Sequence, residues 1–335
     1  MPRRVLVPVD GSNFSEHALP YALGVARRTG ATLHLALVHV PAETVSSTYP
    51  LADAVEGHDA ELREHDTTYM EGLVERLKPS RVEIRPALLG GRVGPALADY
   101  VDDVGIDLIV MTTHGRGGLQ RAWLGSTADS LIRHCMIPIL LVRPRDETRE
   151  IGPDSDRIIG KVLAALDGSD TSETALRDAF ELGITEGASL VLVHALQPPV
   201  AAASPYLPHT IQLTQDEMEA REGHMEDYLE RVADQPWLGE RETAVRVRVD
   251  YHPAPAILEL AEEEDVDLIA LGTHGRGGIR RLILGSVADK VIRGTHRPVL
   301  VHRGVGPIAA IRSTAHPSES IGADADDASA EETTR

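Results

Sequence analysis

The sequence carries one motif twice, as Thr112-Thr113-His114-Gly115-Arg116-Gly117-Gly118 and as Gly272-Thr273-His274-Gly275-Arg276-Gly277-Gly278. Six residues after each copy comes a Gly-Ser pair, Gly125-Ser126 or Gly285-Ser286. An apolar run typical of a buried parallel strand precedes each copy (106–111 and 266–271), and a predicted helix begins at each serine. Such a turn suits phosphate, because glycines let backbone N–H groups approach a ligand and a helix N-terminus presents unpaired donors with a partial positive charge.

Length and composition indicate a two-domain globular protein. The chain has 335 residues, which suits two domains of about 150 residues each. It is 42% hydrophobic and 25% charged, as folded soluble domains are. The net charge of −19 argues against a general nucleic-acid binder, which would need a basic face. The acidity fits either salt adaptation or codon bias, and the sequence leaves that choice open.

Neither a membrane segment nor a disulfide framework is expected. No apolar run approaches the roughly 20 residues that a membrane span needs. Residues 1–4 lead directly into a strand pattern and not into a signal peptide, so we expect a cytoplasmic protein. The single cysteine, Cys135, ends a predicted helix, where we expect a small buried residue and not a nucleophile.

Strand and helix patterns alternate along both halves of the chain. The predicted strands of the first half are 5–9, 32–40, 82–88, 106–111 and 137–142, and its helices follow Asp10-Gly11-Ser12 and span 53–77, 95–104 and 126–134. In the second half the strands are 161–166, 190–195, 245–251, 266–271 and 299–301, with helices from 172, at 215–233 and 255–263, and from 286. Pro20 lies within the first predicted helix, which is expected to start late or to kink there.

The two halves are a duplication. Asp10 and Asp167 lie 157 residues apart, and His114 and His274 lie 160 apart, so the offset drifts by only three residues across a domain. We place the first domain at 1–145 and the second at 158–304, with a linker at 144–157. Residues 313–335 are acidic and poor in apolar residues, and we expect them to form a disordered tail.

Alternating strands and helices predict parallel sheets with helices on both faces. In such sheets ligands bind at the carboxyl ends of the strands, where the chain order reverses. Asp10-Gly11-Ser12 ends the first strand of its repeat and the glycine turn ends the fourth, as Asp167-Gly168-Ser169 and the second glycine turn do in the other repeat. If these strands are neighbours, both motifs of a repeat face one crevice.

Together these motifs resemble the universal stress protein family in its tandem form, over about residues 3–143 and 160–303. The hallmark of nucleotide-binding members is Gly, two residues, Gly, nine residues, then Gly-Ser or Gly-Thr. The second repeat has it in full, at Gly272, Gly275, Gly285 and Ser286, whereas Thr112 takes the first position in the first repeat. Threonine adds a Cβ and disfavours positive φ, so we expect the first site to bind weakly or with altered geometry.

The resemblance implies two Rossmann-like domains of the adenine nucleotide alpha hydrolase-like type, each a five-stranded parallel sheet flanked by helices, packed as an intrachain pseudo-dimer through the fifth strands. It also implies ATP with Mg²⁺ as the cofactor. Asp10 and Asp167 would lie near the ribose, the phosphates or the Mg²⁺, the backbone of Val40 and Ala195 would bind adenine, and the glycine turns would hold the triphosphate. The implied ATP-binding residues are Ala165, Leu166, Asp167, Ala195, Leu271, Gly272, His274, Gly275, Arg276, Gly285, Ser286 and Val287 in the second domain. In the first domain they are Pro8, Val9, Asp10, Val40, Met111, Thr112, His114, Gly115, Arg116, Gly125, Ser126 and Thr127.

Three functions stay open. The favoured one is a nucleotide-linked switch in the stress response, with protein partners and a homodimer of whole chains left open. A nucleotide-independent scaffold would use the same fold, with glycines that only make a tight turn and with Ser126 and Ser286 as helix caps. A slow ATPase or adenylyl transferase would need a base, for which Asp10, Asp167 and His274 are the candidates.

Several other sites are excluded or read as structural. No Gly-x4-Gly-Lys-Ser/Thr loop occurs, and Asp-Gly-Ser stands after the first strand in place of the dinucleotide fingerprint. The 15 histidines are scattered and there is one cysteine, so no metal cluster is predicted. We interpret His114 and His274 as turn residues and His39 and His194 as structural; Arg116 and Arg276 either meet phosphate or are solvated. No catalytic residue is therefore assigned.

Overall fold

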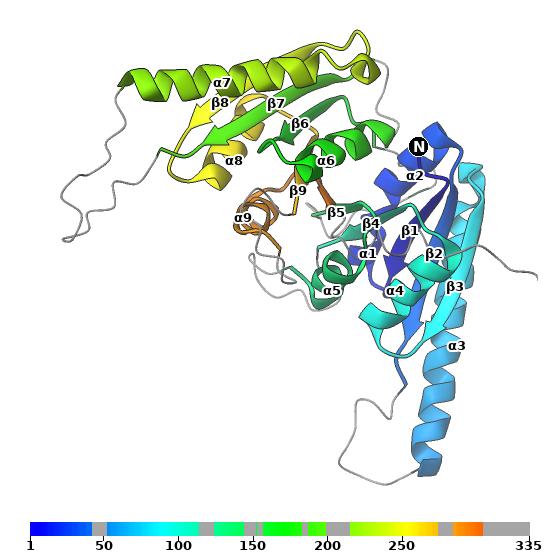
Figure 1. The fold of residues 1–335 in the computed structure, drawn as a ribbon. Helices are drawn as coiled ribbons and strands as arrows, with labels where there is room; N and C mark the ends of the chain where they lie inside the picture. The colour runs from blue at the N-terminus through cyan, green and yellow to red at the C-terminus, as the bar shows by residue number, and fades with distance from the viewer. Residues whose placement is uncertain are drawn as a thin grey trace, which may run out of the picture. The chain divides into compact units, whose positions relative to one another are not determined.

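A computed structural model describes residues 1–41, 52–113, 124–143, 152, 157–182, 187–198, 215–273 and 284–303 (Figure 1). The central parts of both glycine turns lie outside the described residues, and with them His114, Gly115, Arg116, His274, Gly275 and Arg276. The tail predicted at 313–335 lies outside them as well.

Each repeat contains five strands, as the patterns predict. The strands of the first are β1 (Arg4–Val9), β2 (Thr32–His39), β3 (Ile84–Gly90), β4 (Leu108–Thr112) and β5 (Ile139–Val142). Those of the second are β6 (Lys161–Ala165), β7 (Ser189–Leu196), β8 (Thr243–Val249), β9 (Leu268–Gly272) and β10 (Val299–His302).

Helices connect the strands in the predicted order. In the first repeat they are α1 (Asn13–Glu16), α2 (Leu19–Thr29), α3 (Ala52–Leu77), α4 (Val93–Val104) and α5 (Ser126–His134). In the second they are α6 (Asp170–Glu181), α7 (Gln215–Ala233), α8 (Pro253–Glu263) and α9 (Ser286–Gly294). Two short 3₁₀ turns, η2 (Lys78–Ser80) and η3 (Pro236–Leu238), follow the long helices α3 and α7 and have no counterpart in the predicted elements.

The strands form one sheet in the order β3-β2-β1-β4-β5-β10-β9-β6-β7-β8 (Figure 1). All pairs within a repeat are parallel, and β5 pairs with β10 in the antiparallel sense. Leu140 faces Leu300 at the centre of that pair. The prediction that the repeats join through their fifth strands is therefore confirmed.

Helices cover both faces of the sheet, which explains the unbroken apolar strands. In β1 the side chains of Val5, Val7 and Val9 enter one core with residues of α2 and α3, whereas Leu6 enters the other with residues of α4 and α5. In the second repeat α6 and α7 cover the first face and α8 and α9 the second. Strands buried on both faces need apolar residues at consecutive positions, as 5–9 shows.

The helix after the first strand differs between the repeats. In the first repeat it is divided into α1 and α2, and Pro20 stands at the beginning of α2. Proline has no N–H and its ring would clash with the carbonyl four residues earlier, that of Glu16, so the helix cannot run through unbroken. In the second repeat Arg177 takes this place and α6 is continuous. The break expected at Pro20 is confirmed.

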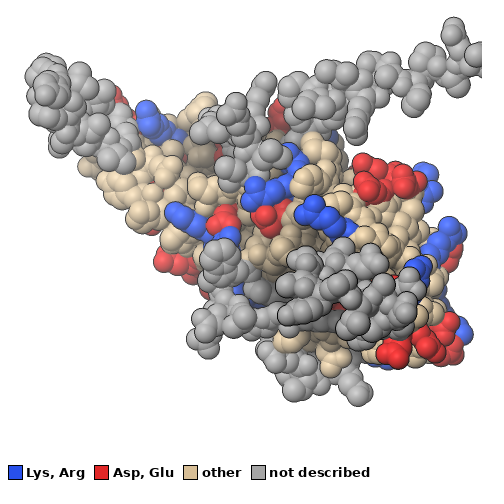
Figure 2. Space-filling view, turned by 90° about the horizontal axis from the view of Figure 1, so that it is seen from below, with Lys and Arg blue, Asp and Glu red and all other residues tan. Residues whose placement is uncertain are grey.

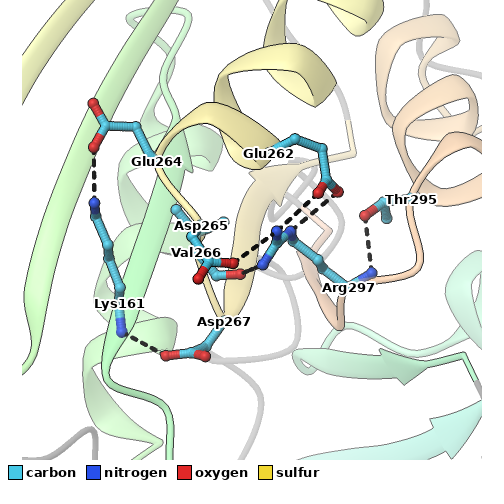
Figure 3. Close-up of polar contacts among 8 residues, drawn as sticks. All are labelled: Lys161, Glu262, Glu264, Asp265, Val266, Asp267, Thr295 and Arg297. Atoms are coloured by element: carbon cyan, nitrogen blue, oxygen red, sulfur yellow. Dashed lines mark hydrogen bonds and ion pairs between the residues drawn. The ribbon is translucent and has the colours of Figure 1, made fainter. Parts of the chain in front are cut away.

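A polar cluster lies at the amino ends of β6 and β10, away from the glycine turns (Figure 3). The guanidinium of Arg297 donates to the Val266 carbonyl, to Glu262 at 2.9 Å and to Asp265 at 3.1 Å. Lys161 donates to Glu264 at 2.8 Å through Nζ, and its backbone N–H donates to Asp267 at 2.9 Å. These contacts tie the end of α8 to the two strands beside it.

The described surface carries both signs of charge. Figure 2 shows acidic and basic side chains interspersed on one face of the molecule. Among the helices that the structure describes, none has both the length and the apolar character needed to cross a membrane.

Candidate functional site

Both repeats place the Asp-Gly-Ser turn beside the glycine turn. β1 pairs with β4, and β6 pairs with β9, so the two motifs of each repeat follow neighbouring parallel strands. From β1 the chain continues outward through β2 and β3, and it returns on the other side as β4 and β5. The two turns thus lie at the point where the strand order reverses, which is where open parallel sheets bind ligands.

The Asp-Gly-Ser turns are built alike. Asp10 Oδ1 accepts hydrogen bonds from the backbone N–H of Ser12 at 3.0 Å and from its hydroxyl at 2.5 Å. Asp167 Oδ1 accepts from the N–H of Ser169 at 3.0 Å and from its hydroxyl at 2.6 Å. The intervening glycines, Gly11 and Gly168, have φ of 79° and 77°, a left-handed conformation that a residue with a Cβ adopts only under strain. Each turn therefore holds one carboxylate rigidly at the end of its strand.

The serines of these turns also begin the following helix. Ser12 Oγ accepts from the Ser15 N–H, and Ser169 Oγ from the Ser172 N–H, each at 3.3 Å. Ser12 and Ser169 are thus N-caps.

The base of each glycine turn is closed by the same two backbone hydrogen bonds. Gly125 N–H donates to Thr113 O and Gly285 N–H to Thr273 O, both at 2.8 Å. Thr113 N–H donates in turn to Val142 O at 3.0 Å, and Thr273 N–H to His302 O at 2.9 Å. The fifth strand of each repeat therefore anchors the residue at which its glycine turn begins.

The helices after the turns present free backbone donors. Gly125 is the N-cap of α5 and Gly285 that of α9, and no side chain of the described residues caps either helix. Asp129 N–H donates to Gly125 O, and Asp289 N–H to Gly285 O, each at 2.9 Å, so the amides before them have no partner within the helix. Those amides belong to Ser126, Thr127 and Ala128 in α5 and to Ser286, Val287 and Ala288 in α9. Ser126 and Ser286 are the first residues of their helices and not the N-caps.

Carboxylates near these helix ends are paired. Asp129 binds Arg133 and Asp289 binds Arg293, each at 2.8 Å along the helix. An unpaired carboxylate would repel a bound anion at the helix N-terminus, whereas an Asp–Arg pair leaves the dipole of the helix to attract it.

Gly272 is needed for a reason other than the predicted one. Gly272 does not have a positive φ. The described glycines that do are 11, 30, 91, 105, 168 and 239. A Cβ on Gly272 would instead lie 2.9 Å from Thr171 Cγ2 and 3.1 Å from the Ser172 backbone N. The glycine thus allows α6 to approach the end of β9, and positive φ is not what distinguishes Gly272 from Thr112.

Thr112 takes the place of Gly272 in the first repeat. It ends β4 at the position of Gly272, and its side chain is buried. The residues that correspond to Thr171 and Ser172 are Phe14 and Ser15, which lie in the short helix α1. The two sites therefore differ in the packing between the end of the fourth strand and the helix that follows the first strand.

The register of the sheet shows that Val40 and Ala195, the two predicted adenine contacts, do not occupy equivalent positions. Arg4 pairs with Thr32 and Lys161 with Ser189, so Val38 corresponds to Ala195 and Val40 to Gln197. His39 O accepts from Gly91 N–H at 3.1 Å and Leu196 O from Asp250 N–H at 3.0 Å, which confirms this alignment. The offset of 157 residues between the repeats, added to Val40, gives Gln197 as its counterpart. The side-chain amide of Gln197 donates to Tyr251 O at 3.1 Å.

The histidines near the second strands are held by acceptors. His39 is 4% exposed, and its ring lies 2.8 Å from Asp66 Oδ2 and 3.2 Å from Asp59 Oδ1. The hydrogen bond with Asp66 raises the pKa of His39 above its ordinary value, against the effect of burial. His194 Nδ1 lies 2.7 Å from Leu166 O, so it supports the end of β6. Both histidines therefore make contacts that support the fold, in keeping with the structural role predicted for them.

Several of the other predicted residues are buried. Pro8, Val9, Met111, Leu166 and Leu271 are buried at the strand ends, so they offer backbone groups and not side chains to a ligand. Cys135 is buried, and burial raises its thiol pKa to about 12. Within the described ranges no group of three or more His, Cys, Asp or Glu could hold a metal ion.

An Mg²⁺ ion brought by a nucleotide fits this donor set better than a resident ion does. Mg²⁺ in phosphate sites is commonly bound by one or two carboxylates together with phosphate oxygens and water. Asp167 makes its hydrogen bonds to Ser169 through Oδ1, and within the described part of the chain Oδ2 is left as such a ligand.

Comparison with known proteins identifies related chains over almost the whole length. The family model described as "Universal stress protein family" matches residues 1–143 and 159–303. A universal stress protein of Mycobacterium tuberculosis is 28% identical over 318 residues, covering 89% of this chain and 94% of the relative. One of Mycolicibacterium smegmatis is 30% identical over 307 residues, covering 89% and 96%.

Solved structures share the fold. A universal stress protein from Archaeoglobus fulgidus superposes with a TM-score of 0.61 at 19% identity, covering 90% of this chain and 98% of that one. A functionally unknown protein from Pseudomonas aeruginosa superposes with a TM-score of 0.59 at 19% identity, covering 93% and 96%.

Proposed function

Because the chain belongs to the universal stress protein family, with two copies of the domain in tandem, we propose that it binds ATP with Mg²⁺ and acts as a nucleotide-linked switch in the stress response. The observation that carries this proposal is the arrangement in the second repeat. There a rigid carboxylate, Asp167, and the uncapped amino end of α9 follow neighbouring strands. Gly272, at the end of β9, lets α6 approach that strand closely.

The chemistry of this arrangement suits a nucleoside triphosphate. The backbone N–H groups of Ser286, Val287 and Ala288 and the Ser286 hydroxyl would donate to phosphate oxygens. Asp167 would hold the ribose or the Mg²⁺ ion, which neutralises phosphate charge when bound. Gln197, at the end of β7, would offer its backbone to adenine in the second repeat, as Val40 would in the first.

We assign the tighter site to the second repeat and a weaker one to the first. Thr112 has a buried side chain at the end of β4, whereas at Gly272 the corresponding space is occupied by Thr171 and Ser172 of α6. This difference favours a first repeat whose role is scaffolding, with nucleotide binding as its lesser property. No catalytic residue is proposed, because the described histidines beside the site, His39 and His194, are engaged with carboxylates and a carbonyl.

Nucleotide binding acts as a switch only if two conformations of the protein differ in their affinity for the nucleotide. We place the protein in the cytoplasm, where ATP is present. We expect protein partners to bind the nucleotide-bound conformation.

Isothermal titration with ATP and Mg²⁺ tests the proposal on wild type and on the matched variants Gly125→Val and Gly285→Val. Both glycines have φ near −60°, which valine also adopts, so the variants should fold. We expect Gly285→Val to abolish the tight site and Gly125→Val to leave it. Absence of binding by wild type would refute the nucleotide function and leave the scaffold function.

A further inference from the structure

Arg143, the residue after β5 of the first repeat, contacts a helix of the second repeat. Its Nη1 donates to the carbonyl of Arg293 and to that of Thr295, both at 3.0 Å. Arg293 lies in the last turn of α9 and Thr295 is the C-cap of that helix. Carbonyls at a helix C-terminus have no partner within the helix and carry partial negative charge, so a guanidinium there is favourable.

The other end of α9 belongs to the candidate nucleotide site. The helix has nine residues and is therefore about 13 Å long, with Gly285 and Ser286 at its beginning. A side chain of the first repeat thus fixes one end of the helix whose other end would bind phosphate in the second repeat.

The same strand end also holds the first glycine turn. Val142, the neighbour of Arg143, accepts the N–H of Thr113, at which the first turn begins. The Val142 carbonyl therefore holds the base of the first glycine turn, and the side chain of the next residue, Arg143, holds α9 of the second repeat.

The C-terminal end of α9 has a second anchor within its own repeat. Thr295 Oγ1 accepts the backbone N–H of Arg297 at 2.9 Å, and the guanidinium of Arg297 is fixed to Glu262, Asp265 and Val266 (Figure 3). The carbonyl and the hydroxyl of Thr295 are thus held from two repeats. The C-terminal end of α9 is therefore held by contacts from both repeats.

The reverse contact is not made. Arg303 stands in the second repeat where Arg143 stands in the first, and Cys135 stands where Thr295 does. Between the described residues no hydrogen bond joins Arg303 to the last carbonyls of α5, although its charge lies close enough to act on the Cys135 thiol. Among the described residues, the contact between an arginine after a fifth strand and the end of the last helix of the other repeat is therefore made from the first repeat to the second.

We propose that Arg143 is a positioning residue that sets the affinity of the second nucleotide site from the first repeat, by holding α9 in place. The inference rests on the proposed nucleotide function. Two charge-assisted hydrogen bonds at a helix end, partly exposed to water, correspond to a change of about three- to tenfold in the dissociation constant.

Titration of the full chain with ATP and Mg²⁺ tests the proposal on Arg143→Gln, Arg143→Lys and the matched control Arg303→Gln. We expect Arg143→Gln to weaken the tight site by about three- to tenfold and Arg143→Lys to recover part of the loss, since its ammonium can reach one carbonyl. Arg303→Gln should stay within about twofold of wild type. Urea unfolding of each variant shows whether the fold is retained, and a merely structural role would alter stability without changing affinity. Unchanged affinity in Arg143→Gln, or an equal loss in Arg303→Gln, would overturn the inference.

Amide hydrogen exchange separates this inference from the proposed function. If wild type binds no ATP, the nucleotide function fails, and the positioning role is then measured without ligand. Arg143→Gln should speed exchange at residues 289–293 of α9, whereas Arg303→Gln should leave exchange at 129–133 of α5 unchanged. Equal exchange rates in wild type and Arg143→Gln would contradict the positioning role itself.

Discussion

Leu140 of β5 and Leu300 of β10 face each other at the centre of the antiparallel pair that joins the two repeats. They are also counterparts, since Leu141 pairs with Val299 and Ile139 with Val301, which makes the register the same from either side. The joint therefore has the self-complementary form of an isologous dimer interface within one chain.

Leu140→Ala and Leu300→Ala should destabilise the protein by similar amounts. Both side chains are fully buried in the same core, so each change leaves a cavity and costs about 2–4 kcal/mol in the free energy of unfolding. Urea denaturation measures this, with the exposed Leu62→Ala as a control that changes stability by less than about 0.5 kcal/mol. A cost of less than about 1 kcal/mol at either leucine would contradict the described joint.

Gly272→Thr should disturb the second site more than Thr112→Gly disturbs the first. The new Cβ would meet Thr171 Cγ2 at 2.9 Å and the Ser172 backbone at 3.1 Å, so α6 must shift at a cost of about 1–3 kcal/mol. The Asp167 turn leads directly into α6, so ATP affinity should fall as well. Urea denaturation and ATP titration of both variants measure the two effects. Wild-type stability and affinity in Gly272→Thr would show that the close approach is not required.

The contribution of His39 to stability should fall as the pH rises. Both of its ring nitrogens face carboxylate oxygens, of Asp66 and Asp59, and the hydrogen bond with Asp66 raises its pKa above the ordinary value of 6.5. A raised pKa in the folded state means that the stabilisation is full below pH 6.5 and is lost as the pH rises through the folded pKa. His39→Gln should therefore cost more stability at pH 6 than at pH 9, by urea denaturation at each pH.

The second repeat provides the control for this pH effect, because Leu196 stands where His39 does. Leu196→Ala should give a loss of stability that does not depend on pH in the same way. An equal pH dependence in wild type and His39→Gln would show that the His39 ring does not titrate in this range.

Arg297→Ala should reduce stability without changing ATP affinity. Glu262 and Asp265 are largely exposed, so their ion pairs contribute little, whereas the contact with the buried Val266 carbonyl contributes more. The expected loss is about 1–3 kcal/mol by urea denaturation. The backbone N–H of residue 297, which binds Thr295, remains in the alanine variant, so ATP affinity should stay within about twofold of wild type. A larger loss in a folded variant would show that the guanidinium of Arg297 also positions α9.

Much of the fold was predictable, because it depends on local patterns. Apolar runs followed by glycine turns gave the ten strands within a few residues, and the repeat offset predicted that the second half copies the first. The helices at Ser126–His134 and Gln215–Ala233 have the predicted bounds. The joint through the fifth strands followed from the family resemblance.

The details that the sequence missed depend on contacts between distant segments. The role of Gly272 comes from α6, about a hundred residues earlier in the chain, and no local property of the glycine shows it. His39 meets Asp59 and Asp66 only because α3 lies along β2. Ala195 was expected to play the part of Val40, whereas the sheet register aligns Ala195 with Val38.

Native mass spectrometry of the full chain incubated with ATP and Mg²⁺ tests the central claim most directly, because it counts bound nucleotides per chain. We predict that wild type and Gly125→Val each retain one tightly bound nucleotide and that Gly285→Val retains none. A wild-type chain without nucleotide, or retention of one by Gly285→Val and not by Gly125→Val, would contradict the assignment of the tight site to the second repeat.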